Sequence, residues 1–179
     1  MQHTKENFFQ FRRFRDGEFR MTPSRYRGKY LTKTVGRAPK ASAPQVSRTM
    51  RSNKSWGTRP EVFLGRTLRK KILRSDLPGK PDFVFPRAKL AIFVHGCFWH
   101  RCPECKIALP KTHSSYWKKK LERNVERDRL NKERLSSLGW KVLEIWEHTI
   151  LEDPKSTACK IKQIISARKF LSEPFFSIG

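Results

Sequence analysis

Eleven consecutive residues, His95 to Cys105, hold three cysteines, two histidines and two large aromatic side chains. Cys102 and Cys105 form a C-x-x-C pair, a spacing that lets two thiolates reach one metal ion from a tight turn. Cys97 can add a third sulfur, and His148, which follows a strand-like run, is the best candidate for a fourth ligand. A lone C-x-x-C pair can also be a redox pair, so the interpretation depends on that fourth ligand. The stretch predicts a loop held by a metal ion.

Cysteine usage and hydropathy restrict the class of protein. Three of the four cysteines cluster beside histidine, which indicates a metal site rather than the disulfide framework of a small secreted chain. The fourth, Cys159, is expected to be a half-buried helix thiol without a role. The N-terminus has no uninterrupted apolar segment, and no apolar run approaches about 18 residues. We therefore expect a cytoplasmic protein with one folded domain.

The charge balance indicates the partner. The chain has 40 Lys and Arg against 16 Asp and Glu, a formal charge of +24, which favours nucleic acid. A ribosome-associated or merely basic protein is the alternative. Residues 1–60 hold fifteen Lys and Arg and three acids. We expect a basic, disordered arm over 1–45, a folded domain over 46–172 and a loose tail over 173–179. Alternatively, the arm is an upstream segment and translation starts at Met21 or Met50.

The first ordered elements are predicted from caps and apolar spacing. Thr58 and Glu61 form a capping-box pattern, and a helix should run from there to about Leu73 with one apolar face. That face comprises Leu64, Leu68 and Ile72. Two apolar strands, 82–85 and 90–94, should then pair antiparallel, which would place Asp82 close to Val94 and His95. A turn-capping role for Asp82 is the alternative.

A long helix is predicted over about 115–138, ended by Gly139. Its core-facing stripe would comprise Trp117, Leu121, Val125, Asp128, Lys132 and Leu135. A carboxylate in such a stripe is costly unless it is paired, and the nearby histidines are the expected partners of Asp128. Surface pairing with Arg127 or Arg129 is the alternative. A polar row on an adjacent face could follow a nucleic-acid groove or merely face solvent. That row comprises Lys120, Asn124, Arg127 and Asn131.

The remaining elements complete an α/β layer structure. A buried strand is predicted over 141–146, and Asp153 should cap a last helix over about 155–171. Its core-facing residues would be Ile161, Ile164, Ile165 and Ala167. The order of elements predicts a small mixed sheet covered by helices. A carboxylate beside histidines and opposite a basic helix points to metal-assisted hydrolysis of a phosphodiester.

Several motifs in this order resemble the very-short-patch repair (Vsr) DNA mismatch endonucleases. The motifs are LPGKPD at 77–82, FVHGCFWH at 93–100, NVERDR at 124–129, LGWKV at 138–142 and WE at 146–147. The resemblance covers about residues 46–151. It implies a restriction-endonuclease-like core and a magnesium-dependent enzyme that nicks one strand beside the thymine of a T:G mismatch, the product of 5-methylcytosine deamination. It also implies a structural zinc.

The resemblance assigns roles to matching residues. Asp82 and the backbone carbonyl of Val94 would hold magnesium, and His100 would activate water. His95 lies beside it, Asp128 would orient a histidine, and Glu61 would lie near the catalytic water as well as capping its helix.

Further assignments concern zinc and DNA. The zinc ligands would be Cys97, Cys102, Cys105 and His148. Phe98 and Trp99 would be pushed between base pairs, or would simply cover the zinc. Lys120 and Asn124 would face the mispaired bases.

Two other readings share the same residues. One is a restriction- or defence-associated endonuclease of the same fold. The other is a zinc-stabilised DNA-binding module without catalysis, against which the intact acid and histidine set argues. For the endonuclease, the expected partner is double-stranded DNA with a T:G mismatch, with mismatch-repair proteins as candidate partners and a monomeric state.

Overall fold

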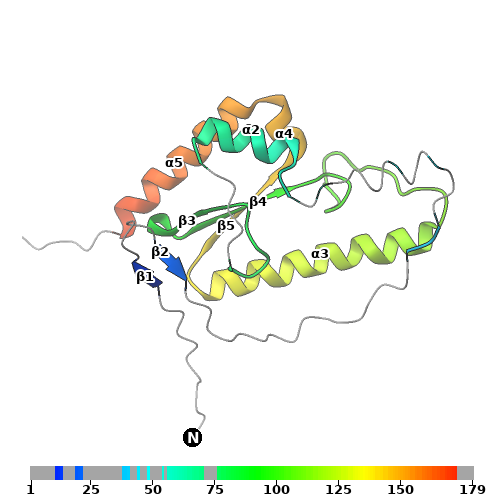
Figure 1. The fold of residues 1–179 in the computed structure, drawn as a ribbon, viewed down its shortest axis with the longest axis horizontal. Helices are drawn as coiled ribbons and strands as arrows, with labels where there is room; N and C mark the ends of the chain where they lie inside the picture. Colours follow the sequence, from blue (N-terminus) through cyan, green and yellow to red (C-terminus); the bar gives the residue numbers. More distant parts are fainter. Residues whose placement is uncertain are drawn as a thin grey trace, which may run out of the picture. The chain divides into compact units, whose positions relative to one another are not determined.

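The computed structural model describes residues 11–13, 19–21, 38–40, 44, 48, 54, 56–70 and 76–172 (Figure 1). The chain divides into two compact units, residues 1–34 and residues 35–179. In the first unit, β1 (Phe11–Arg13) pairs antiparallel with β2 (Phe19–Met21). The sequence analysis placed no strand there. Most of the predicted arm and the tail 173–179 lie outside the described residues, so both stay predictions.

The second unit is built on a three-stranded mixed sheet with the order β3-β4-β5 (Figure 1). Its strands are β3 (Phe83–Phe85), β4 (Leu90–His95) and β5 (Lys141–Trp146). β3 pairs antiparallel with β4, and the short 3-10 helix η1 (Pro86–Ala88) connects them. β4 pairs parallel with β5. The predicted small mixed sheet is therefore confirmed; β3 starts one residue later than expected, and β4 ends one residue later.

One face of the sheet forms the core with three helices, α2 (Arg59–Leu68), α4 (Glu147–Glu152) and α5 (Pro154–Ser172). Alternating residues of β4 and β5 bury their side chains there, because successive side chains of a strand point to opposite faces. The fully or nearly fully buried members include Leu64, Leu90, Ile92, Ile150 and Ile161. This core layer supports the three strands, and the residues of the candidate site lie near the ends of those strands.

Helix α2 ends earlier than predicted. Arg69 adopts a left-handed conformation with φ of 52°, and Lys70 N–H donates to the Gly65 carbonyl at 2.9 Å. This pattern is a Schellman motif, in which a left-handed residue reverses the chain and ends the helix. The helix therefore ends although the apolar pattern continues in the sequence. Leu64 and Leu68 pack on the core as expected, whereas Ile72 lies outside the described residues.

Helix α3 (Ser114–Ser137) covers the other face of the sheet (Figure 1). It stops where predicted, with Gly139 at φ of 77°. Its buried stripe differs from the prediction, because Val125 is 43% exposed and Lys132 is also exposed, while Asn131 is only 7% exposed. The buried stripe therefore includes Asn131 in place of Val125 and Lys132. The side chain of Asn131 packs directly against Gly79 in the turn before β3.

The C-terminal elements contain one unexpected helix. Residues after β5 form α4, so that His148 lies in a helical first turn rather than in a loop. Asp153 caps α5 as predicted, because its Oδ1 accepts the Ser156 N–H at 2.9 Å. Two predictions about α5 were wrong. Ala167 was expected to face the core and Cys159 to be half-buried, whereas both are exposed. Among the described helices, none has the length and apolar composition to span a membrane.

Candidate active site and metal centre

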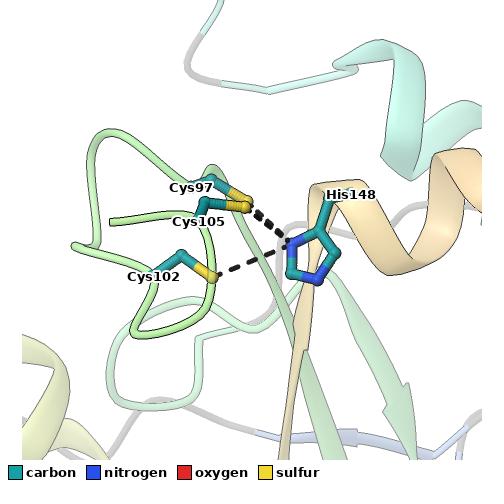
Figure 2. Close-up of side chains that lie close together, drawn as sticks. All are labelled: Cys97, Cys102, Cys105 and His148. Carbon is teal, nitrogen blue, oxygen red and sulfur yellow. Dashed lines mark hydrogen bonds between the residues drawn. The ribbon is translucent and has the colours of Figure 1, made fainter. Parts of the chain in front are cut away.

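The structure brings together the four predicted metal ligands, Cys97, Cys102, Cys105 and His148 (Figure 2). His148 Nδ1 lies 3.1 Å from the sulfur of Cys97, 3.8 Å from that of Cys102 and 3.3 Å from that of Cys105. A tetrahedral zinc with Zn–S near 2.3 Å and Zn–N near 2.0 Å separates sulfur from nitrogen by roughly 3.5 Å. The distances and the Cys₃His donor set therefore fit zinc.

The surroundings of these ligands favour a cation. Burial raises the pKa of the Cys97 thiol to about 12, so this sulfur needs a metal to become a thiolate. His148 Nε2 lies 2.9 Å from a Glu104 carboxylate oxygen, which leaves Nδ1 for the metal. The loop is further tied to α4, because Cys97 N–H donates to Glu147 Oε1 at 2.7 Å. Three of the metal ligands therefore lie in the loop that follows β4, and the fourth, His148, lies at the start of α4.

Asp82 is positioned by the antiparallel pairing of β3 with β4. Its N–H donates to the Ile92 carbonyl at 2.9 Å, and its Oδ2 accepts the Val94 N–H at 2.7 Å. Burial raises the pKa of Asp82 to about 7 despite the hydrogen bond from Val94, and the nearby Glu61 carboxylate raises it further. The proximity of Asp82 to Val94 is confirmed. A buried carboxyl with a second acid beside it is a setting that a divalent cation would stabilise.

Glu61 departs from the predicted capping box. Its carboxylate accepts the Gly57 N–H at 2.8 Å and the Thr58 hydroxyl at 2.7 Å, and it is 4% exposed. The Thr58 side chain therefore donates to Glu61 and makes no hydrogen bond to the helix backbone. Glu61 therefore fixes the turn before the helix, and its carboxylate lies buried near Asp82.

His95 and His100 stack, with ring centroids 4.1 Å apart and planes inclined by 20°. His100 Nδ1 lies 2.5 Å from Asp128 Oδ2, and Arg127 lies 3.4 Å from the other oxygen of Asp128. Asp128 therefore has both of the partners that the sequence suggested, whereas Arg129 pairs with Glu126 and Glu133 instead. Burial works to raise the pKa of Asp128, but the His100 contact and nearby cations hold it below its usual value.

The residues expected to face DNA form an aromatic cluster with α3. Trp99 contacts Phe98 at 5.1 Å and Trp117 at 6.0 Å between ring centroids. Lys120 Nζ lies 5.4 Å from the Trp99 ring centroid, and Asn124 Nδ2 donates to the Trp99 carbonyl at 3.1 Å. In this structure the group fastens the metal loop to the helix. Phe98 and Trp99 remain partly exposed.

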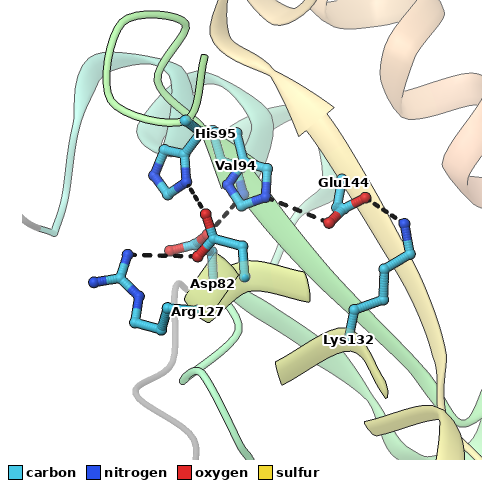
Figure 3. Close-up of polar contacts among 8 residues, drawn as sticks. Asp82, Val94, His95, Arg127, Lys132 and Glu144 are labelled. Atoms are coloured by element: carbon cyan, nitrogen blue, oxygen red, sulfur yellow. Dashed lines mark hydrogen bonds and ion pairs between the residues drawn. The ribbon is translucent and has the colours of Figure 1, made fainter. Parts of the chain in front are cut away.

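Sequence reasoning missed one acid at this site. Glu144 of β5 lies between His95 Nε2, at 3.7 Å, and Lys132 Nζ, at 2.5 Å (Figure 3). The sequence contained a signal for this residue, because Glu144 interrupts an otherwise apolar run. An acid at such a position of a buried strand needs a partner. The strand prediction treated residues 141–146 as a buried run and left this acid without a role.

Comparison with known proteins finds a family and several relatives that this chain resembles. Residues 40–106 match the family described as DNA mismatch endonuclease Vsr. The chain is 44% identical over 117 residues to the type II nicking enzyme V.NaeI of Lentzea aerocolonigenes, covering 60% of this chain and 70% of the relative. It is 36% identical over 135 residues to the type II nicking enzyme V.NmeDIP of Neisseria meningitidis serogroup C, covering 72% and 91%. It is 43% identical over 86 residues to the DNA mismatch endonuclease Vsr of Escherichia coli K12, covering 48% and 55%.

Proposed function

This chain belongs to the family of the DNA mismatch endonuclease Vsr and is a DNA endonuclease, and we propose that it nicks one strand beside the thymine of a T:G mismatch in a Mg²⁺-dependent reaction. One observation carries the chemistry. The partly buried Asp82 carboxyl interacts with the charges of Glu61 and His100, and the His100 ring is hydrogen-bonded to Asp128. This set supplies a metal-binding acid and a histidine oriented by a carboxylate, the parts that phosphodiester hydrolysis needs.

Asp82, with the backbone carbonyl of Val94, would hold Mg²⁺. Bound there, the ion would neutralise charge on the scissile phosphate and lower the pKa of a coordinated water. The raised pKa of Asp82 supports this assignment, because burial and the neighbouring Glu61 leave the ionised carboxylate short of positive charge. Glu61, held by hydrogen bonds from Gly57 and Thr58, would lie near the catalytic water beside Asp82.

His100 would act as the general base. Its Nδ1 faces a carboxylate oxygen of Asp128 at 2.5 Å, and the lowered pKa of Asp128 keeps that acid ionised near neutral pH. An ionised carboxylate only accepts hydrogen bonds, so Nδ1 carries the proton. The other nitrogen, Nε2, is then free in the neutral ring to take a proton from the attacking water.

Recognition of the mismatch would use the aromatic pair Phe98 and Trp99 with Lys120 and Asn124. An aromatic wedge between base pairs favours a mismatched step, because such a step costs less to unstack. Lys120 already lies over the rings of Trp99, Tyr116 and Trp117 at 5.3–5.7 Å, which places a cation next to the wedge. The zinc loop would serve as the rigid mount for both Phe98 and Trp99.

A second candidate follows from the names of the relatives. Several are called type II nicking enzymes, so this chain could instead accompany a restriction system and nick in a fixed sequence context. The two candidates share the catalytic set and differ in the DNA that they select.

A nicking assay separates them. Otherwise identical duplexes carrying T:G, C:G or T:A at one position are incubated with full-length protein, with and without Mg²⁺, and Asp82→Ala serves as the inactive control. The proposal expects Mg²⁺-dependent nicking of the T:G duplex alone. Equal nicking of the C:G duplex would replace mismatch specificity with sequence-specific nicking, and equal activity of Asp82→Ala would remove the metal assignment.

A further inference from the structure

Glu144 is an acid in the middle of β5, on the sheet face that packs against α3. It is paired in register with Phe93, and His95 lies two residues further along β4 on the same face. A carboxylate on a covered sheet face is costly unless it is paired. The Glu144 side chain is 29% exposed and has two partners, His95 on the neighbouring strand and Lys132 on the helix that covers this face (Figure 3).

The two oxygens of Glu144 have different partners. Oε2 lies 2.5 Å from Lys132 Nζ, a charge-assisted hydrogen bond that holds the carboxylate in place. Oε1 faces His95 Nε2 at 3.7 Å, a contact that is longer than a hydrogen bond. The His95 contact, outweighing burial, and the Lys132 bond lower the pKa of Glu144 to about 2. Glu144 is therefore ionised and can only accept.

The position of His95 makes this contact informative. The ring is 6% exposed and is stacked on His100 at 4.1 Å, with Trp146 at 5.5 Å and Phe93 at 6.0 Å. Stacking fixes the plane of an imidazole. It does not choose between the two orientations related by a half-turn of the ring, or between the two tautomers, because both have the same shape. A carboxylate facing one edge of the ring makes that choice.

We propose that Glu144, held by Lys132, is a positioning residue for His95 that selects the ring orientation with a protonated Nε2. Each histidine of the stack then has its own carboxylate, Asp128 for His100 and Glu144 for His95. Nδ1 of a neutral His95 is left as an acceptor. The importance of this for catalysis rests on the proposed function, in which His95 lies beside the general base.

The test compares matched variants of the full-length, zinc-loaded protein. Glu144→Leu removes the carboxylate and keeps a side chain of similar size that suits a strand. Glu144→Asp keeps a carboxylate, with both acceptor oxygens, on a side chain one methylene shorter and is the conservative rescue. Lys132→Met, at a side chain that is 49% exposed, loosens the carboxylate without touching His95. Glu133→Leu is the control, because it removes an exposed acid of the same helix that pairs with Arg129.

The first readout needs neither DNA nor Mg²⁺. Long-range ¹⁵N–¹H spectra at pH 8 report which ring nitrogen of His95 carries a proton, and a spectrum of His95→Gln assigns the signals. We expect a protonated Nε2 in the wild type, Glu144→Asp and Glu133→Leu. Glu144→Leu should give a mixture with protonated Nδ1, and Lys132→Met a smaller change. A wild-type pattern in both disrupting variants, or a protonated Nδ1 in the wild type, would overturn the proposal.

The second readout is single-turnover nicking of a T:G duplex. Glu144→Leu should slow the step by about 10- to 100-fold, as loss of an orienting partner does, with little change in the half-saturating DNA concentration. Glu144→Asp should recover part of the rate. A loss that follows DNA affinity alone, or one that Glu144→Asp does not recover at all, counts against positioning. Absence of nicking in the wild type would instead refute the proposed function, and the spectra would still decide the role of Glu144.

Discussion

Replacing Asp82 with Asn should abolish nicking and yet stabilise the protein at alkaline pH when Mg²⁺ is absent. The pKa of Asp82 rises from 3.8 to about 7 on folding, chiefly because the carboxyl is buried. Between these two values the folded state binds a proton that the unfolded state has lost. The free energy of unfolding therefore falls as pH rises through this window and levels off above about pH 7. Asn has a similar shape, still accepts the Val94 N–H and never ionises.

The size of the effect follows from the same pKa. A rise from 3.8 to about 7 corresponds to about 4 kcal/mol, because each pKa unit is worth about 1.4 kcal/mol. Rearrangement and water entry around a side chain that is only partly buried reduce what appears in folding. We expect Asp82→Asn to raise the free energy of unfolding by about 1–3 kcal/mol at pH 8 and by almost nothing at pH 4.

The assay is urea unfolding of zinc-loaded wild type and variant at several pH values, in buffer without chelator so that the zinc loop stays intact. Adding Mg²⁺ at pH 8 should stabilise the wild type and leave Asp82→Asn unchanged, because a ligand stabilises only the folded state that binds it. A variant that is less stable at pH 8, or a difference that does not depend on pH, would refute the raised pKa. Equal Mg²⁺ stabilisation of both proteins would remove Asp82 from the metal site.

Further predictions concern the loop, the arm and the base. Purified protein should hold one zinc per chain, and Cys105→Ser should lose the metal and unfold at lower temperature, whereas the exposed Cys159→Ser should change neither; metal-free protein of wild-type stability would contradict this. Deleting residues 1–45 should weaken binding to all duplexes alike and flatten the salt dependence, measured by titration at several salt concentrations; loss of T:G discrimination would instead make the arm part of the reader. In single-turnover nicking, His100→Ala should lose about 10²- to 10⁴-fold in rate and Asp128→Asn less; a larger loss for Asp128→Asn would exclude its role as orienting partner.

Local pattern in the sequence determined most of the framework. Apolar runs and turn residues located the three strands, and Gly139 marked the end of the long helix where the chain needs a positive φ. The hairpin length brought Asp82 to Val94, because antiparallel pairing across a short connection leaves little choice of register. The C-x-x-C spacing identified the metal loop, since the ligands that it supplies are near neighbours in the chain.

Tertiary structure decided how these elements meet. The sequence told which residues share a face of α3 but not which side of it meets the sheet, so Asn131 is buried where Lys132 was expected. The contact of Glu144 with His95 depends on the register of the parallel pair β4 and β5, whose strands are joined through the loop and α3. Periodicity is a property of one segment. Contacts between segments depend on relative rotation and register, which only the packed chain determines.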